Sequence, residues 1–184
     1  MTLVETLIGS SIATVVIGGV MTLVWQVGNE QRRGFADAAL EQNGAVLQDK
    51  VVGLLRSMSA TESVSFGSQI SGTGFYQRII VARGATPDYP REEIYYTPAS
   101  FKLTHDPNRN VSGDEVTLFT GTNQMVLRNA YFYPSLKSGG VLDNATINVY
   151  LSFDDNGLSG RHNSDGTQKT NTVNRYFTVR FRNP

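Results

Sequence analysis

The sequence predicts an α+β protein in which one long N-terminal helix packs by its second half on an antiparallel β-sheet. Two observations support this fold class. No proline occurs before Pro87, and the first 58 residues carry helix-period apolar patterns. The remaining residues alternate apolar and polar side chains with the period of a strand. We expect an apolar helical segment over 1–29, its amphipathic continuation over 30–58, and an antiparallel β head over 59–184.

The first segment has the composition of a membrane-spanning helix. No charged side chain occurs from residue 6 to residue 29, and about 20 apolar residues suffice to cross a bilayer. Trp25 lies near the far end, where an aromatic residue anchors the membrane interface. A signal peptide would need a basic start and a small-residue cleavage site, which the segment lacks. We therefore expect a retained anchor that starts at a processed or initiating Met1.

Glu5 is the one acidic residue at the start of this apolar run. A carboxylate inside a membrane segment costs about 2.5–3.5 kcal/mol on insertion scales. Two interpretations stay open. Glu5 interacts with the dipole of its own helix in the first turns, or it pairs with the N-terminal ammonium group of a neighbouring copy.

Gly18 and Gly19 interrupt the middle of the apolar segment. Each glycine costs about 1 kcal/mol relative to alanine inside a helix. The pair indicates either close helix packing through small residues or local melting when the environment changes.

The second half of the helix carries an apolar stripe with heptad-type spacing. Its members are Leu40, Leu47, Val51, Leu54 and Met58, with Gly44 in the slot that permits close approach. We assign this stripe to packing on the chain's own sheet. Residues 1–58 as one helix would be about 85 Å long, too long for a head of this size to bury.

Seven segments after the helix have strand character, separated by Gly, Pro and Asp turn signals. Alternation is cleanest from Ile147 to Phe153 and from Phe177 to Phe181, which predicts a sheet with one covered face. Residues 57–65 are interpreted as the helix exit. The expected strands are 75–83, 93–96, 100–104, 114–120, 124–133, 146–153 and 175–182.

The composition excludes several kinds of chemistry. There is no Cys, so disulfides and thiolate metal sites are excluded, and His105 and His162 are the only histidines. Sixteen basic and sixteen acidic residues give no net charge, which argues against broad phosphate neutralisation and specific nucleic-acid binding. No nucleotide, protease or hydrolase motif is present, so we expect no enzyme and no cofactor.

Three further features invite functional interpretations. Oxygen-bearing Asp154, Asp155, Asn156 and Asp165 suit Ca²⁺, although a polar loop of Asx turns is the favoured interpretation. Asn110 and Asn144 begin formal N-glycosylation sequons. The aromatic residues could form a binding surface, but alternation favours core or cross-strand packing. These residues are Tyr89, Tyr95, Tyr96, Tyr131, Phe132 and Tyr133.

The N-terminal residues Met-Thr-Leu-Val-Glu-Thr-Leu-Ile, positions 1–8, resemble the mature start of type IV pilins and type II secretion pseudopilins. In that superfamily a prepilin peptidase cuts before an apolar residue, which is then N-methylated. The resemblance extends to the whole chain, because these proteins place a sheet on the second half of a long helix. It implies that Met1 is the methylated N-terminus and that Glu5 pairs with the N-terminal amine of a neighbouring subunit during assembly.

Two departures from the family pattern matter. Many bacterial pilins have a disulfide near the C-terminus, and this chain has no Cys. Many also have a proline at the position of Thr22, where the helix loosens in the filament. We therefore expect Gly18 and Gly19 to take over that role, with melting near residues 17–22.

The resemblance implies a major pilin: a homo-oligomeric helical filament of identical subunits, used for adhesion, twitching motility or DNA uptake. It implies residence in the inner membrane before assembly and on the extracellular surface afterwards. Prepilin peptidase, motor ATPases and a platform protein are the implied partners. A pseudopilin of type II secretion and a single-span anchored binding module are the alternatives, and the binding module would not need Glu5.

Overall fold

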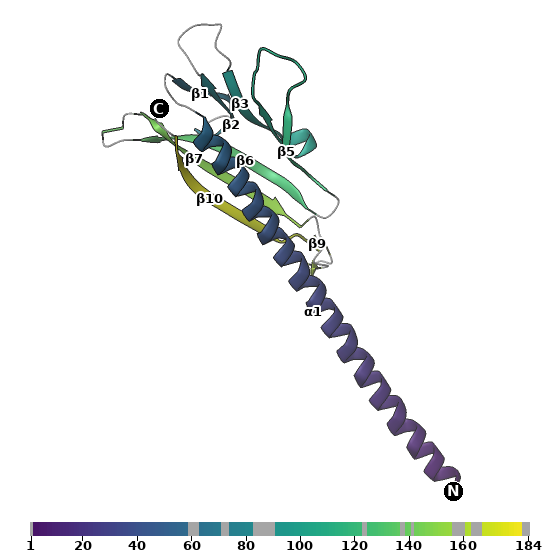
Figure 1. The fold of residues 1–184 in the computed structure, drawn as a ribbon. Helices are drawn as coiled ribbons and strands as arrows, with labels where there is room; N and C mark the ends of the chain where they lie inside the picture. The colour runs from purple at the N-terminus through teal and green to yellow at the C-terminus, as the bar shows by residue number, and fades with distance from the viewer. Residues whose placement is uncertain are drawn as a thin grey trace.

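The protein has the predicted α+β architecture (Figure 1). The computed structural model describes residues 2–58, 63–70, 74–82, 91–122, 125–136, 139–140, 142–155, 161–162 and 167–181. These residues form one α-helix, an eight-stranded antiparallel sheet and a two-stranded ribbon. The helix is α1 (Leu3–Ser57), followed by β1 (Ser63–Gln69), β2 (Tyr76–Ala82), β3 (Arg91–Thr97), the 3₁₀ turn η1 (Pro98–Ser100), β4 (Lys102–Asp106), β5 (Val116–Thr120), β6 (Val126–Leu136), β7 (Leu142–Asp154), β8 (Arg161–His162), β9 (Gln168–Lys169) and β10 (Thr172–Arg180).

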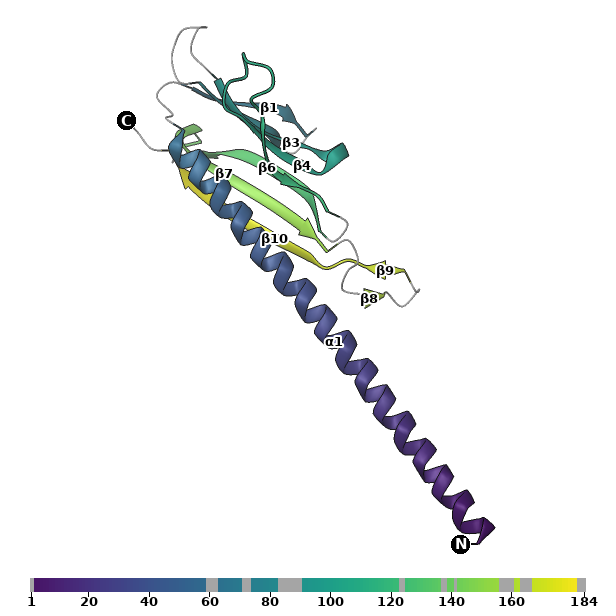
Figure 2. The same cartoon turned by 45° about the vertical axis from the view of Figure 1, so that its right-hand side comes forward.

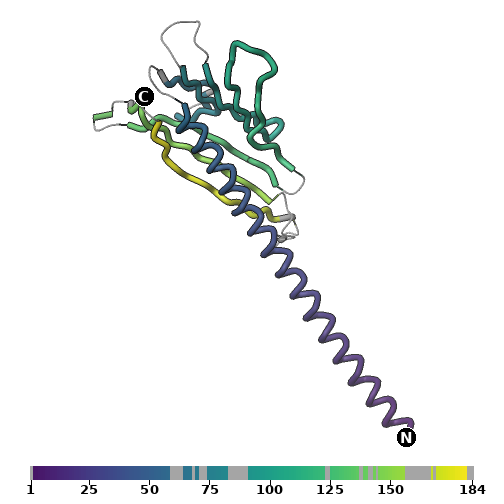
Figure 3. The backbone as a smooth tube through the Cα atoms, viewed as in Figure 1, coloured from purple at the N-terminus to yellow at the C-terminus, as the bar shows by residue number. Residues whose placement is uncertain are grey.

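Helix α1 runs without interruption from the tip of the molecule to the far end of the head (Figure 3). Its 55 residues correspond to a length of about 82 Å. The first half projects away from the sheet, and the second half lies across it (Figure 2). Ala36 is the first residue of α1 that the head buries. The protruding part is therefore longer than the apolar segment by about two turns.

The buried face of α1 differs from the predicted stripe at one position. Leu55 is buried and Leu54 is only partly covered. The buried residues repeat every eleven positions, or about 3.67 residues per turn, which is closer to the 3.6 of a straight helix than is the 3.5 of a heptad repeat. A heptad template therefore deviates from the packed face by one residue near the C-terminal end of the helix, where it selects Leu54 in place of Leu55. The buried positions are Ala36, Leu40, Gly44, Leu47, Val51, Leu55 and Met58.

The sheet has two wings that meet at β2. Its strand order is β10-β7-β6-β2-β3-β4-β5, with β1 also paired to β2, and the pairs are antiparallel. One wing consists of β10, β7 and β6, and the other consists of β3, β4 and β5. The first wing meets β2 at a single residue pair, Tyr76 opposite Phe132. The sheet curls so that β5 returns toward α1, where the Phe119 ring packs edge-on against Phe153 at 5.8 Å. The core is thus enclosed by α1 and both wings.

Tyr96 links the two wings through the core. Its side chain is buried, and its hydroxyl lies 2.5 Å from the Leu127 carbonyl oxygen and 2.7 Å from that of Arg128. Burial raises the pKa of this hydroxyl to about 12, so it stays a donor at physiological pH. The residues around it are apolar. The largest fully buried side chains are Phe132, Phe153, Leu40, Leu47, Leu55, Met58, Ile79, Ile94, Leu103, Leu127, Ile147 and Leu151.

Two strand assignments needed correction, and the sequence did not predict β8, β9, residues 134–136 of β6 or residues 142–145 of β7. Part of the expected helix exit is β1, in which Val64 and Phe66 pair with Val81 and Ile79; its alternating serines disguised it as a loop. The strand expected over 100–104 begins only at Lys102. Phe101 before it has the left-handed φ of 51°, which closes the turn from β3 to β4 and excludes extended pairing there.

We predict that Leu55→Ala lowers the free energy of unfolding by about 2–5 kcal/mol, because it removes a fully buried side chain. The matched control Leu54→Ala should cost about 1 kcal/mol. Urea unfolding of the detergent-solubilised full chain, followed by near-ultraviolet circular dichroism of the tyrosines, measures both. Equal losses of unfolding free energy, or a larger loss for Leu54→Ala, would show that Leu54 belongs to the packed face as the heptad stripe predicts.

Candidate functional site

The apolar half of α1 is a surface that the chain does not cover itself. Its large apolar side chains between Leu3 and Val27 are 53% to 80% exposed. The most apolar 18-residue window has a mean hydropathy of 2.1 and no buried residue. This helix is long and apolar enough to cross a membrane. A surface of this kind requires lipid or another protein around it.

The hydroxyl groups within this segment are satisfied by their own helix. Each donates to a carbonyl oxygen three or four residues earlier, as Ser and Thr do in apolar surroundings. The bonds run from Thr6 to Leu3, Ser10 to Leu7, Ser11 to Leu7, Thr14 to Ser10 and Thr22 to Gly18, at 2.8–3.0 Å. The segment therefore presents no unsatisfied hydroxyl donor among these residues to a non-polar partner.

Glu5 and Thr2 form a capping box at the helix start. The Thr2 N–H donates to Glu5 Oε2 at 2.8 Å, and the Glu5 N–H donates to Thr2 Oγ1 at 3.4 Å. Two free N–H groups of the first turn are satisfied in this way. The Thr-x-x-Glu spacing is the sequence signal of a capping box, although this role was not among the expectations for Glu5.

The capping box satisfies a hydrogen bond of Glu5 but not its charge. Among the residues that the structure describes, no basic group lies within ion-pair distance of its carboxylate. Met1, whose amine would be the partner by resemblance, lies outside the described residues. A carboxylate that enters an apolar environment in this state needs a cation from outside these residues. Glu5 is therefore the candidate assembly residue.

Gly18 and Gly19 are helical and exposed in the isolated chain. A Cβ atom added at either position would meet nothing within 4 Å. Neither glycine is required by a contact among the described residues. Both earlier interpretations, packing between copies and local melting, remain predictions about the assembled state.

The acidic residues proposed for Ca²⁺ hold strand ends together. Asp154 lies 2.5 Å from Arg128 Nε and accepts from the Thr172 hydroxyl at 2.6 Å. Asp155 accepts from the Asn171 N–H at 2.9 Å. Asn156 and Asp165 lie outside the described residues. These contacts join strand ends and are not Asx turns, so the loop of Asx turns and the calcium site both stay predictions.

The remaining predicted sites are dispersed. Asn110 is exposed in a turn after β4, where its N–H donates to Asn108 Oδ1. The backbone of Asn144 lies in β7, and its side chain is outside the described part. His105 belongs to the large sheet, whereas His162 belongs to the β8–β9 ribbon. In the described backbone these four residues lie in separate elements of the fold.

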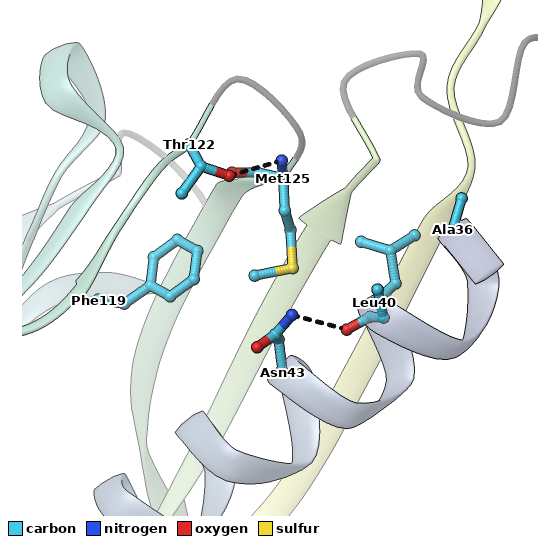
Figure 4. A pocket seen from close by; sticks show the side chains of 7 residues that line it. Ala36, Leu40, Asn43, Phe119, Thr122 and Met125 are labelled. Carbon is cyan, nitrogen blue, oxygen red and sulfur yellow. Dashed lines mark hydrogen bonds between the residues drawn. The ribbon is translucent and has the colours of Figure 1, made fainter.

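A cavity of about 250 Å³ opens where α1 meets the β5–β6 turn. Figure 4 shows the Met125 side chain between Phe119 and the helix. The polar groups here bond locally, since Asn43 Nδ2 donates to the Ala39 carbonyl and the Met125 N–H donates to Thr122 Oγ1. No charged side chain lines the cavity, so its described lining offers no acid or base for catalysis.

The predicted aromatic set divides between core and surface. Tyr96 and Phe132 are buried, whereas Tyr131 and Tyr133 are half-buried on the sheet face opposite α1. Tyr89 lies outside the described residues. Tyr150 and Tyr176 join this outer face. Sequence reasoning missed these two, although strand alternation places them opposite the apolar positions of β7 and β10.

Glu93 is a buried acid whose negative charge is only weakly compensated by nearby basic groups. Its Oε2 atom makes no hydrogen bond and lies 3.5 Å from Arg109 Nε and 3.8 Å from an Arg78 guanidinium nitrogen. It faces Asp106 across β3 and β4. Burial raises the pKa of the Glu93 carboxyl above its ordinary value of 4.5, more than the two arginines lower it.

No protein-family model, no curated protein and no solved structure matches the chain significantly.

We predict that Glu93 makes the protein less stable as the pH rises above about 4.5. The folded chain binds this proton more tightly than the unfolded chain does, so stability is lost as the pH rises through the raised pKa. Glu93→Gln should therefore melt at a higher temperature relative to wild type at pH 7 than at pH 4.5. Thermal unfolding at both values measures this difference. The exposed Glu30→Gln is the control, and an identical offset at both pH values would refute the assignment.

We also predict that Gly18→Ala and Gly19→Ala each stabilise the isolated helix by about 1 kcal/mol. The added methyl group meets no neighbour, so only the glycine penalty changes. Amide hydrogen exchange in micelles should slow about fivefold near residues 18–22. Gly9→Ala should protect only its own turn. Unchanged exchange near the pair would rule out local melting there.

Proposed function

We propose that the chain is the structural subunit, a major pilin, of a type IV pilus-like extracellular filament. The observation that carries the proposal is the uncovered apolar helix whose one carboxylate lacks a cationic partner among the described residues. The long helix lying on an antiparallel sheet is compatible with a pilin-like architecture. The role is structural, without catalysis or a cofactor.

In this proposal the same helical surface is covered first by lipid and later by neighbouring subunits. Before assembly, the lipid of the inner membrane surrounds the apolar half of α1, and Trp25 lies near the interface. During assembly, the helices of identical subunits replace the lipid and form the filament core. Satisfied hydroxyl groups allow both environments.

Glu5 has a specific part in this exchange. A buried charge without its partner costs about 3–5 kcal/mol, so burial of Glu5 requires a cation. The N-terminal ammonium group of a neighbouring subunit supplies it in the proposed filament. The pair would then select one helix register rather than add much stability.

Processing and export complete the proposal. Prepilin peptidase would generate and methylate the N-terminus at Met1, and a motor ATPase with a platform protein would extract the subunit from the membrane. Adhesion, twitching motility and DNA uptake are the activities such a filament would serve.

The test separates the charge of Glu5 from its capping role. Glu5→Gln keeps an oxygen that accepts from the Thr2 N–H but removes the charge, whereas Glu5→Ala removes both. We expect both variants to lower the yield of sheared filaments at least tenfold, because about 1.4 kcal/mol corresponds to a factor of ten. Mass spectrometry of the N-terminal peptide should show a methylated Met1 in wild-type filaments.

Thr6→Ala is the matched control, because the Thr6 hydroxyl bonds only within its own helix, and its yield should stay normal. Normal filaments from Glu5→Gln with none from Glu5→Ala would show that assembly requires the capping role of Glu5 and not its charge. A membrane-retained, unmethylated chain that forms no filament and ignores both mutations would identify a single-span binding module. A filament that stays within the cell envelope and supports secretion would identify a pseudopilin.

A further inference from the structure

The sheet face opposite α1 carries an ordered grid of neutral polar and aromatic side chains. Strands β6, β7 and β10 pair in register, and α1 lies on one side of them (Figure 2). Every second residue of each strand therefore points to the opposite face. A row of three tyrosines crosses the centre of this face. The grid has the rows Asn129–Ser152–Asn174, Tyr131–Tyr150–Tyr176 and Tyr133–Asn148–Thr178.

Phe75 completes an aromatic wall beside β6. Its ring stacks on Tyr131 at a centroid distance of 5.6 Å and meets the edge of Tyr133 at 5.2 Å. Tyr131 in turn stacks on Tyr150 at 5.8 Å. These centroid distances lie within the range of about 4.5–7 Å typical of aromatic rings in contact, so only the parts of the rings that do not face one another are open to a ligand.

The wall borders a cavity of about 260 Å³. Its lining is Phe75, Asn129, Tyr131, Tyr133 and Tyr150. The Tyr131 hydroxyl donates to Asn129 Oδ1 at 2.6 Å, which orients the amide. Within the described residues, Asn129 Nδ2 donates to no protein group, so its two N–H donors are available to a ligand.

The grid contains no carboxylate and no basic group. On this face of the three strands the nearest charged positions are Arg128 and Asp154 at one end, which pair with each other, and Arg180 toward the other end. Arg175 of β10 points to the other face, where it contacts Glu41 of α1. Burial raises the pKa values of Tyr131 and Tyr133 above 10.0. These hydroxyl groups stay neutral at physiological pH, so the surface selects for an uncharged ligand.

We propose that this cavity binds a neutral pyranose unit of a saccharide. A pyranose presents a C–H face that packs on the open parts of the aromatic rings, and its rim of hydroxyl groups both donates and accepts hydrogen bonds. Tyrosine and asparagine offer the same combination of rigid apolar area and two-way hydrogen bonding. The cavity is close to the lower end of small-molecule sites, about 300 Å³, which suits one sugar ring.

A proline-rich peptide is the main competitor, because aromatic grooves also bind such peptides. A polyproline segment needs several successive pockets and has no N–H donor at proline. The described lining forms one compact cavity whose tyrosine hydroxyl oxygens also accept hydrogen bonds, which sugar hydroxyl groups can donate and proline cannot. The chemistry therefore favours the sugar.

Saturation-transfer-difference NMR on the full chain tests the proposal. The chain is held in deuterated dodecylphosphocholine micelles, which carry no sugar headgroup, so the result does not depend on filament assembly. The probes are the methyl glycosides of glucose, galactose and mannose, and decaproline. Irradiation of the aromatic protons should transfer saturation to one face of at least one glycoside.

Tyr150→Ala should reduce this transfer about two- to tenfold, the range expected for one aromatic contact. Asn129→Ala should reduce the transfer by a similar factor, because the loss of one hydrogen bond costs a similar binding free energy. Thr178→Ala, on the same face but outside the cavity lining, is the matched control, because the Thr178 hydroxyl donates to Asn148 Oδ1, and it should leave the transfer unchanged.

Thermal unfolding of each variant shows whether the fold persists, and Asn129→Ala tests the site even if the loss of the Tyr150 ring disturbs the sheet. Three results would overturn the proposal. These are no transfer to any glycoside above a micelle-only sample, transfer that both cavity variants leave unchanged, and transfer to decaproline alone. None of them bears on the filament, which is tested separately through Glu5.

Discussion

The organisation of this molecule depends on an apolar helix that its own head cannot cover. Apolar surface leaves water with a gain of about 25 cal/mol per Å², and the first half of α1 exposes such surface from Leu3 to Val27. The head begins to bury the helix only at Ala36. Hydroxyl groups within the segment turn back on their own helix. The chain is thus built for a non-polar environment at one end and for water at the other.

One straight helix serves both environments because the 11-residue repeat of its packed face stays close to the 3.6 residues per turn of an uncoiled α-helix. The sheet then needs no bend in α1 to remain in contact from Ala36 to Met58. Polar contacts fix the position of the head along the helix, with Arg175 bound to Glu41 and Asn171 bound to Asp37 at 2.6 Å. Because α1 covers one face of β6, β7 and β10, the other face stays free for the aromatic grid.

Sequence periodicity predicted the fold class, the length of the helix and most strands, because each depends on local patterns. It placed Leu54 in the core instead of Leu55, since a heptad template drifts against a straight helix. It missed β1, where serines alternate with Val64 and Phe66. The tyrosine row could not be predicted, because it depends on the register between β6, β7 and β10, which distant residues decide. The capping role of Glu5 was readable and overlooked.

In the proposed filament, apolar packing and the charge of Glu5 perform different tasks. Apolar contacts are non-directional, so helices lined with Leu, Val and Ile could slide past one another with little change in buried area. A charge at one fixed position penalises every register that leaves it unpaired. The capping box holds the Glu5 carboxylate against the Thr2 N–H, so its position relative to the helix axis is defined before any partner arrives. The energy of assembly would then come from the whole apolar surface, and its geometry from a single residue.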